Sequence, residues 1–355
     1  ENYRIAMQDL VYNPGLSLLE LVSVESAKRL NLFVKNISEQ VRKEIKNPKL
    51  RSILEFPVLF LGAKPNKTPA FYNFMNHADF GLGTWYPKGG FNAVALGMVK
   101  LAKELGVEFH VNEEVIGIDY ENNQAKKIRT QNGVYEADVF ISGADYSHTE
   151  KLLNGNRNYT EDYWQKKTFA PSSFLYYVAF NRKVKNLLHH NLFFDTDFEE
   201  HAKEIYDTKE LPKQPLFYAN FSSKTDDSLC EEGKEVGFFL IPVAVDLEDN
   251  EEIHEKYFQL ILDRIKKCTG EDLSDAIVFK KSFGVKDFKE RYHSCRGNAY
   301  GLANTLLQTS VLRPTIKNKK LKNFFYTGQL TVPGPGVPPA LISGKVVTDY
   351  ILKNN

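Results

Sequence analysis

Apolar residues recur at spacings of three and four in several stretches of the chain, and this spacing predicts amphipathic helices. The first eighty or so residues are predicted to be mostly helical. Their clearest helix runs over residues 30–45 and ends before Asn47-Pro48. Its apolar face consists of Leu30, Phe33, Val34, Ile37, Val41 and Ile45, and its charged side of Lys35, Glu39, Arg42, Lys43 and Glu44.

The next segment, Leu50–Leu61, is almost continuously apolar. Such a run predicts a helix or strand buried inside the protein. A surface that contacts a membrane is the second interpretation, because large apolar patches on a surface mark interaction sites. The pattern alone leaves both interpretations open.

The middle of the chain switches between helical and strand-like periodicity. A turn at Gly83–Phe91 precedes an amphipathic helix at Asn92–Leu105, which Gly106 ends. Short strands are then predicted at Val107–Val111, Glu114–Tyr120, Ala125–Thr130, Val134–Ala137 and Asp138–Ser142. This order of helix, strand, small meander and buried strand is typical of a nucleotide-binding α/β domain.

A second block, residues 160–285, is rich in strands. Ser173–Phe180, Leu216–Phe221 and Val236–Val245 predict a largely antiparallel sheet, and Ile253–Lys267 predicts a helix with one apolar face. The run from Lys317 to Lys322 is predicted to be a solvated loop.

The last stretch combines a buried strand, a loop of turn formers and a helix. The strand is Phe324–Thr327, Gly328 ends it, and a helical pattern begins near Ala340. Glycines before a helix let a ligand approach the backbone, and the free N–H groups and helix dipole favour an electron-rich group. The stretch matches neither a P-loop nor Gly-x-Gly-x-x-Gly. A tight strand-to-helix connection without a ligand is the competing interpretation.

Composition narrows the classes of function. The chain has 46 basic and 45 acidic residues, a formal charge of +1, so nothing predicts a nucleic-acid partner. Its three cysteines fit reduced thiols of the cytoplasm, and no histidine or cysteine spacing predicts a metal site. No apolar run is long enough to span a bilayer, and the first residues do not read as a signal peptide.

Several short motifs occur in a fixed order along the chain. They are Trp85-Tyr86-Pro87-Lys88-Gly89-Gly90, Ser142-Gly143-Ala144-Asp145, Arg291-Tyr292, Arg296-Gly297, Tyr300-Gly301-Leu302, Gln308, Arg313-Pro314, Tyr326-Thr327-Gly328 and Pro333-Gly334-Pro335-Gly336-Val337-Pro338. Together they resemble the carotenoid desaturases of the bacterial phytoene desaturase type, which are FAD-dependent, amine-oxidase-like flavoproteins. The resemblance covers essentially the whole chain, except that the family's opening Gly-x-Gly-x-x-Gly is absent.

The resemblance implies a mixed α/β (α+β) fold: the C-terminal part of a two-domain flavoprotein, with a Rossmann-like FAD domain and a substrate domain of antiparallel sheet and helices. It divides the chain at residues 1–82 (helical, membrane-contacting), 83–155 (FAD domain), 156–288 (substrate domain) and 289–355 (FAD domain). We therefore expect the chain to begin at the family's helical substrate domain. Binding of whole FAD is in question because the pyrophosphate cradle is missing.

The implied reaction is desaturation of a carotenoid polyene: a hydride passes to flavin N5, and a proton leaves the neighbouring carbon. The cofactor-binding residues that the resemblance suggests are Trp85, Gly89, Gly90, Gly143, Ala144, Arg296, Gly328, Gly334, Gly336 and Val337. Asp145 is the candidate that assists proton removal, and capping of the helix at His148–Leu153 is its alternative role. Arg296 is equally compatible with an ion pair.

The implied substrate is phytoene-like or a late, hydroxylated carotenoid that undergoes 3,4-desaturation. Because such a substrate is lipid-soluble, we expect a cytoplasmic enzyme that associates peripherally with a membrane, with Leu50–Leu61 as the entrance. Oligomerisation is left open. The competing functions are cis–trans isomerisation of a carotene, a non-catalytic carotenoid or lipid carrier, and oxidation of a soluble amine.

Overall fold

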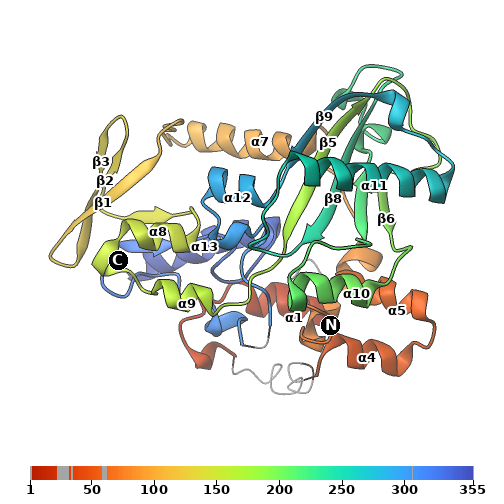
Figure 1. Cartoon of the computed structure of the whole chain (residues 1–355). Helices are drawn as coiled ribbons and strands as arrows, with labels where there is room; N and C mark the ends of the chain where they lie inside the picture. The colour runs from red at the N-terminus through yellow and green to blue at the C-terminus, as the bar shows by residue number, and fades with distance from the viewer. Residues whose placement is uncertain (1, 22–31, 33–34, 58–61, 306, 355) are drawn as a thin grey trace. The chain divides into compact units, whose positions relative to one another are not determined.

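The structure, a computed structural model, describes residues 2–21, 32, 35–57, 62–305 and 307–354 (Figure 1). Contacts divide the chain into two compact units. Unit 1 comprises Glu1–Thr84, Asn112–Ala170 and Lys289–Asn355, and unit 2 comprises Trp85–Val111 and Pro171–Phe288. The mixed α/β class expected from the sequence is confirmed, and the four-part domain division stays a prediction.

Unit 2 is built on a five-stranded antiparallel sheet in the order β6-β7-β8-β5-β9. Its strands are β5 (Ser172–Phe180), β6 (His190–Phe193), β7 (Phe217–Asn220), β8 (Glu235–Val243) and β9 (Ile277–Phe283). Buried and partly exposed residues alternate strictly along β8, as the two-residue period of a strand requires. The predicted antiparallel sheet is therefore confirmed.

Helix α11 (Glu251–Thr269) covers one face of this sheet (Figure 1). Asn250 caps its N-terminus by accepting a hydrogen bond from the N–H of Ile253, and Gly270 ends it in a left-handed conformation. The core is formed by inward strand residues such as Phe239 and Ile241 together with the apolar stripe of α11. The short helix α10 (Phe198–Lys203) also belongs to this unit.

Helix α7 (Gly90–Glu104) matches its predicted span. The strand predicted at Val107–Val111 is wrong, because the backbone there is irregular. A strand forms only when a neighbour accepts its ladder of hydrogen bonds, and no described residue pairs with this segment. Apolar character alone therefore misidentified it.

Unit 1 contains β4 (Phe140–Ser142) and β10 (Phe324–Tyr326), and the sequence predicted both of these strands. The structure shows that they pair in parallel, which the sequence analysis did not predict. Helix α13 (Val337–Asn354) follows β10 and starts a few residues before the expected Ala340. Val346 and Val347 of α13 pack with Phe325 and Ile316 in a buried cluster. This cluster fixes the loop between β10 and α13 at both ends.

The predicted meander is present as β1 (Val115–Glu121), β2 (Gln124–Thr130) and β3 (Val134–Glu136), paired in that order. Asn122 and Asn123 both have positive φ, as the tight hairpin between β1 and β2 requires. Helices α8 (Tyr146–Leu152) and α9 (Glu161–Gln165) follow in unit 1, and α12 spans Val285–Tyr292.

The N-terminal part is helical, with α1 (Asn2–Ile5), α4 (Ile37–Glu44), α5 (Pro48–Glu55) and α6 (Phe74–Asn76). Helix α4 lies within the helix predicted over residues 30–45, and Asn36 caps its N-terminus. Residues 30, 31, 33 and 34 of that prediction lie outside the described residues. Asn47 caps α5, so the predicted break is confirmed. Residues 58–61 of the apolar segment lie outside the described residues. Within residues 2–21, 35–57, 62–305 and 307–354, no helix combines the length and apolar content needed to cross a bilayer.

Candidate functional site: the loop between β10 and α13

The loop that joins β10 to α13 contains glycines in conformations that only glycine adopts easily. Gly334 has φ of 136° and Gly336 has φ of 112°. A Cβ atom at Gly334 would lie 3.2 Å from Asn304 Oδ1, and one at Gly336 would lie 3.3 Å from Pro339 Cδ. The loop therefore requires glycine at both positions for conformation and for space.

Hydroxyl groups hold the start of this loop against α13. The fully buried Ser343 accepts a hydrogen bond from the N–H of Gly328 at 2.8 Å, and its Oγ lies 2.7 Å from Thr327 Oγ1. Thr331 Oγ1 donates to the carbonyl oxygen of Gly328 at 2.8 Å. The path of the loop is thus fixed by buried polar contacts.

A buried cation, Arg313, lies beneath the loop. Its Nε donates to Thr331 O and its Nη2 to Gln329 O, both at 2.9 Å, and its Nη1 donates to Asn304 Oδ1 at 2.6 Å. No carboxylate among the described residues pairs with it, and burial lowers the pKa of Arg313 to about 10. The guanidinium therefore holds loop carbonyls inward and adds positive charge behind the backbone.

The end of the loop presents free donors. Gly336 and Val337 are exposed, and no described residue accepts a hydrogen bond from either N–H group. These N–H groups lie at the start of α13, where the helix dipole is positive. The arrangement suits an electron-rich group that approaches Gly336 and Val337.

The β4–β10 pairing brings Gly143 to the same place. The N–H of Thr327 donates to Ser142 O at 2.9 Å, and a Cβ built on Gly328 would lie 3.9 Å from Gly143 O. The predicted residues Gly143, Ala144, Gly328, Gly334, Gly336 and Val337 thus lie on two adjacent strand ends and the loops that follow them.

Asp145 caps the N-terminus of α8, which is the alternative role that the sequence analysis gave for it. Oδ1 accepts from the N–H of His148 at 3.2 Å, and Oδ2 accepts from the N–H of Cys295 at 3.0 Å. Desolvation raises the pKa of this carboxyl, although the backbone N–H groups oppose the shift. A carboxylate with a raised pKa accepts a proton more readily, which is compatible with proton removal from a substrate. The role of Asp145 in proton removal stays a prediction.

Arg296 lies in the segment that Asp145 anchors. It adopts a left-handed conformation, with φ of 62°, and its guanidinium lies 5.6 Å from the ring centre of Phe169. Its Nη1 donates to Lys167 O at 3.4 Å. Cofactor binding by Arg296 stays a prediction.

Trp85, Gly89 and Gly90 belong to unit 2. Trp85 is 84% exposed, and the N–H of Gly89 donates to Asp226 Oδ2 at 2.5 Å. Gly89 and Gly90 both have positive φ, which explains the paired glycines at the start of α7. The loop after β10 lies in unit 1. Cofactor binding by Trp85, Gly89 and Gly90 stays a prediction.

Sequence reasoning did not identify the wall that an apolar substrate would meet. On the sheet face that does not carry the core, Tyr177 and Phe238 lie opposite each other, with ring centres 5.3 Å apart. Tyr218 and Leu240 continue this face across β7 and β8. The signal was present in β8, whose sequence EVGFFLIPV is apolar at positions pointing to both faces.

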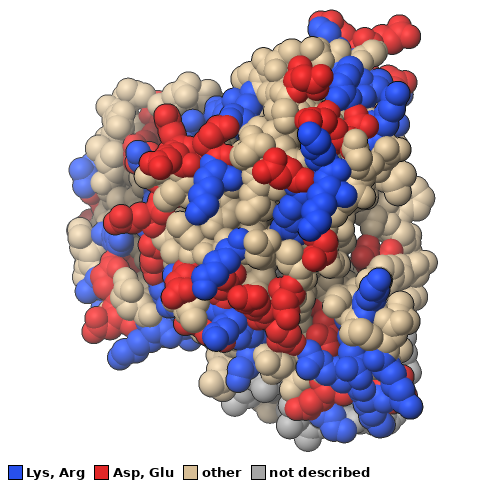
Figure 2. All heavy atoms as spheres, turned by 45° about the vertical axis from the view of Figure 1, so that its right-hand side comes forward, with Lys and Arg blue, Asp and Glu red and all other residues tan. Residues whose placement is uncertain are grey.

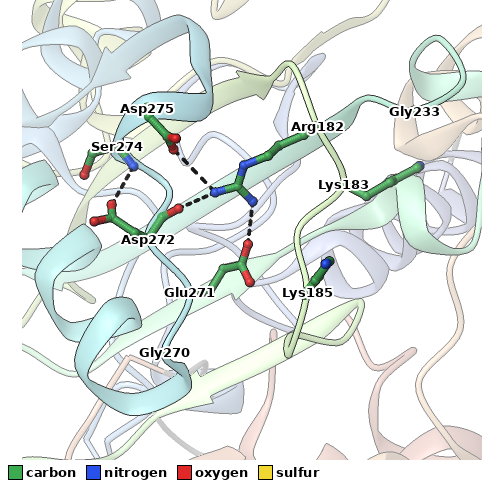
Figure 3. A pocket seen from close by; sticks show the side chains of 9 residues that line it. All are labelled: Arg182, Lys183, Lys185, Gly233, Gly270, Glu271, Asp272, Ser274 and Asp275. Carbon is green, nitrogen blue, oxygen red and sulfur yellow. Dashed lines mark hydrogen bonds and ion pairs between the residues drawn. The ribbon is translucent and has the colours of Figure 1, made fainter.

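One surface hollow of unit 2 is lined by charged residues and does not suit a polyene (Figure 3). It measures about 840 Å³ and includes Arg182, Lys183 and Lys185. Arg182 is bound by Glu271 at 2.5 Å and also by the carbonyl oxygen of Asp272. The basic residues that line the hollow are therefore largely neutralised by the acidic residues that line it as well, Glu271, Asp272 and Asp275.

Comparisons with known proteins place this geometry in context. The family model for flavin containing amine oxidoreductase matches residues 17–352. The carotenoid 3,4-desaturase of Haloarcula japonica is 38% identical over 99% of this chain and 72% of its own length. The zeta-carotene-forming phytoene desaturase of Myxococcus xanthus is 31% identical over 88% of this chain and 61% of its own.

Solved structures agree on the fold alone. An oxidoreductase from Methanosarcina mazei aligns with a TM-score of 0.59 and 16% identity over 94% of this chain and 74% of its own. A putative protoporphyrinogen oxidase from Exiguobacterium sp. 255-15 gives 0.57 and 11% over 98% and 77%. This chain thus spans between about three fifths and three quarters of the proteins that it resembles.

Proposed function

Since the chain belongs to the flavin-containing amine oxidoreductase family, and within it to the carotenoid desaturases, we propose that it carries out FAD-dependent desaturation of a carotenoid polyene. The observation that carries the proposal is the 38% identity over 99% of the chain to a carotenoid 3,4-desaturase. The proposed substrate is accordingly a late, hydroxylated carotenoid or a phytoene-like precursor. Relatives with either name match the chain.

The residues of unit 1 fit one part of FAD. The free N–H groups of Gly336 and Val337 suit the electron-rich edge of a flavin ring, and the glycines leave space for the ring to approach. The chain contains no Gly-x-Gly-x-x-Gly for the pyrophosphate. When FAD is bound, it would accept a hydride from an allylic carbon of the substrate.

The residues of this chain are proposed to orient the flavin and to accept the substrate proton. The N–H groups of Gly336 and Val337 orient the ring edge and favour negative charge there, supported by the buried Arg313 behind the loop. Asp145 Oδ1 or Oδ2 is the proposed acceptor of the substrate proton, and its raised pKa favours that role. Opening of the cap at His148 or Cys295 would free an oxygen for this step.

The apolar outer face of the unit 2 sheet is the proposed wall for the polyene. Tyr177 is 45% exposed, which is unusual for an aromatic residue in a central strand. A polyene offers no polar atoms, so apolar area and shape orient it. The aromatic rings at Tyr177, Tyr218 and Phe238 supply that area and exclude water.

The proposal includes peripheral contact with a membrane, from which such a substrate would enter. Leu50 and Ile53 of α5 are exposed and lie on one side of the helix, three residues apart. They belong to the apolar segment that the sequence analysis singled out. Bacterial origin, cytoplasmic location and oligomeric state remain predictions.

The test supplies the protein with FAD and a carotenoid in detergent and follows product absorption. Desaturation lengthens the conjugated system and shifts absorption strongly to the red, whereas isomerisation changes it little. Gly336→Val should abolish turnover and weaken flavin retention after gel filtration, because a β-branched residue is strained at this φ. Gly155→Ala is the control, since a Cβ there meets nothing within 4 Å. Carotenoid binding without product would instead favour a carrier.

A further inference from the structure

Basic residues are concentrated in one short part of unit 1. Residues 35–67 carry eight basic and three acidic side chains, a net charge of +5. Because the whole chain carries +1, everything outside this segment carries −4. The eight basic residues are Lys35, Arg42, Lys43, Lys46, Lys49, Arg51, Lys64 and Lys67.

Helices α4 and α5 leave much of this charge on the surface. Glu55 is buried and pairs with Arg42 at 3.1 Å, so one acidic group is removed from the surface. Lys46, Lys49 and Lys67 are exposed and make no ion pair with a described carboxylate. In Figure 2, Lys and Arg side chains gather at the lower right of this face of the molecule, where α4 and α5 lie.

Apolar side chains lie among these lysines. Leu50 is 49% exposed and Ile53 is 42% exposed, and both belong to α5. Lys49 lies in the first turn of the same helix. Arg51 Nε is held by Ile45 O at 2.7 Å, which ties α5 to the end of α4. The surface therefore presents apolar groups framed by cations on a fixed pair of helices.

We propose that a basic face formed by α4, α5 and the turn at residues 64–67 docks on a bilayer that contains anionic phospholipids. The turn belongs to this face because the N–H of Ile37, at the start of α4, donates to Thr68 O at 3.1 Å. Cations that frame exposed apolar residues match the interface of such a bilayer, where phosphate and carboxylate groups lie above hydrocarbon. A nucleic acid or an acidic protein would satisfy the lysines but would leave Leu50 and Ile53 against polar groups. The inference deepens the proposed function, on which it rests for a membrane-soluble substrate.

The test measures sedimentation with vesicles of phosphatidylcholine alone and of phosphatidylcholine with phosphatidylserine. The triple variant Lys46→Gln, Lys49→Gln and Lys67→Gln should lose about a hundredfold in its partition to phosphatidylserine vesicles, because each basic residue near such a surface contributes about fivefold. Leu50→Ser with Ile53→Ser should weaken binding to both kinds of vesicle.

The matched control neutralises three exposed lysines of unit 2, Lys213, Lys256 and Lys267, and should change partition by less than about threefold. Equal losses in both triple variants, or equal binding of the unaltered protein to both kinds of vesicle, would overturn the proposal. Turnover in neutral detergent distinguishes failure of membrane docking from failure of the proposed desaturase function. The triple variant Lys46→Gln, Lys49→Gln and Lys67→Gln should keep full turnover in this detergent. Absence of turnover in the unaltered protein and in every variant would reject the desaturase function, and the vesicle result would still decide on membrane docking.

Discussion

Arg313 is the residue whose removal tests the account of the loop most directly. Its guanidinium donates to Thr331 O, Gln329 O and Asn304 Oδ1 at 2.6–2.9 Å, and to Gln308 O at 3.1 Å. In Arg313→Met these four acceptors stay buried without their donor. We expect the loop to lose its fixed path and unit 1 to lose stability.

The magnitude follows from two opposing contributions. Hydrogen bonds to a charged group contribute roughly 1.5–3 kcal/mol each, so four contribute on the order of 6–12 kcal/mol. Burial opposes this, because it lowers the pKa of Arg313 to about 10, which corresponds to roughly 3 kcal/mol against the charged form. The expected net loss in the free energy of unfolding of unit 1 is therefore about 3–9 kcal/mol, because the favourable hydrogen bonds exceed the cost of burying the charge.

The assay can report on unit 1 alone. The chain has two tryptophans; Trp164 is buried in unit 1, and Trp85 is exposed in unit 2. In a Trp85→Phe background, urea unfolding followed by fluorescence reports on Trp164. Arg182→Met serves as the control, because Arg182 forms its ion pairs within unit 2 and should leave this transition unchanged.

Arg313→Lys separates charge from geometry. Lysine keeps the cation but lacks the planar fork that reaches several carbonyls at once, so it should recover less than half of the lost stability. A loss below about 1 kcal/mol in Arg313→Met would refute the reasoning, because the buried carbonyls would then have found other donors. Full recovery in Arg313→Lys would show that charge alone matters.

Three further results are expected. Burial lowers the pKa of His201 to about 4, so the stability of unit 2 should fall by about 3 kcal/mol as pH drops from about 6.5 to 4, and His201→Gln should flatten this dependence in urea titrations. Desolvation raises the pKa of Glu150 above 4.5, so its contribution is fully present below about pH 4.5 and is lost as pH rises through the raised value; Glu150→Gln should remove that slope from the Trp164 transition. Gly334→Ala should cost unit 1 about 1–3 kcal/mol, because its φ of 136° and the contact with Asn304 are both unfavourable for a side chain, and flavin retention by gel filtration should fall with it.

Local patterns in the sequence were sufficient for elements that complete their own contacts. The β1–β2 hairpin was predictable because Asn122 and Asn123 tolerate positive φ, and α11 because its apolar stripe faces a sheet of the same unit. The loop after β10 was predictable from its glycines and prolines. Arg313 was recognised only as part of a motif, since the convergence of four carbonyls on one guanidinium is a tertiary property.

The failed strand at Val107–Val111 shows why other parts could not be predicted. The apolar residues of α7 and of this segment have the pattern of buried elements, yet Leu101, Leu105 and Val111 are 57%, 76% and 75% exposed. The parallel pair β4–β10 shows the same mismatch, because parallel strands are normally covered on both faces and Ile141 is 48% exposed. In each unit, then, some apolar residues have the spacing of a buried face, but the described residues do not cover that face. Periodicity reports which face of an element is to be covered, whereas the element forms as a strand only when the covering backbone is present to accept its hydrogen bonds.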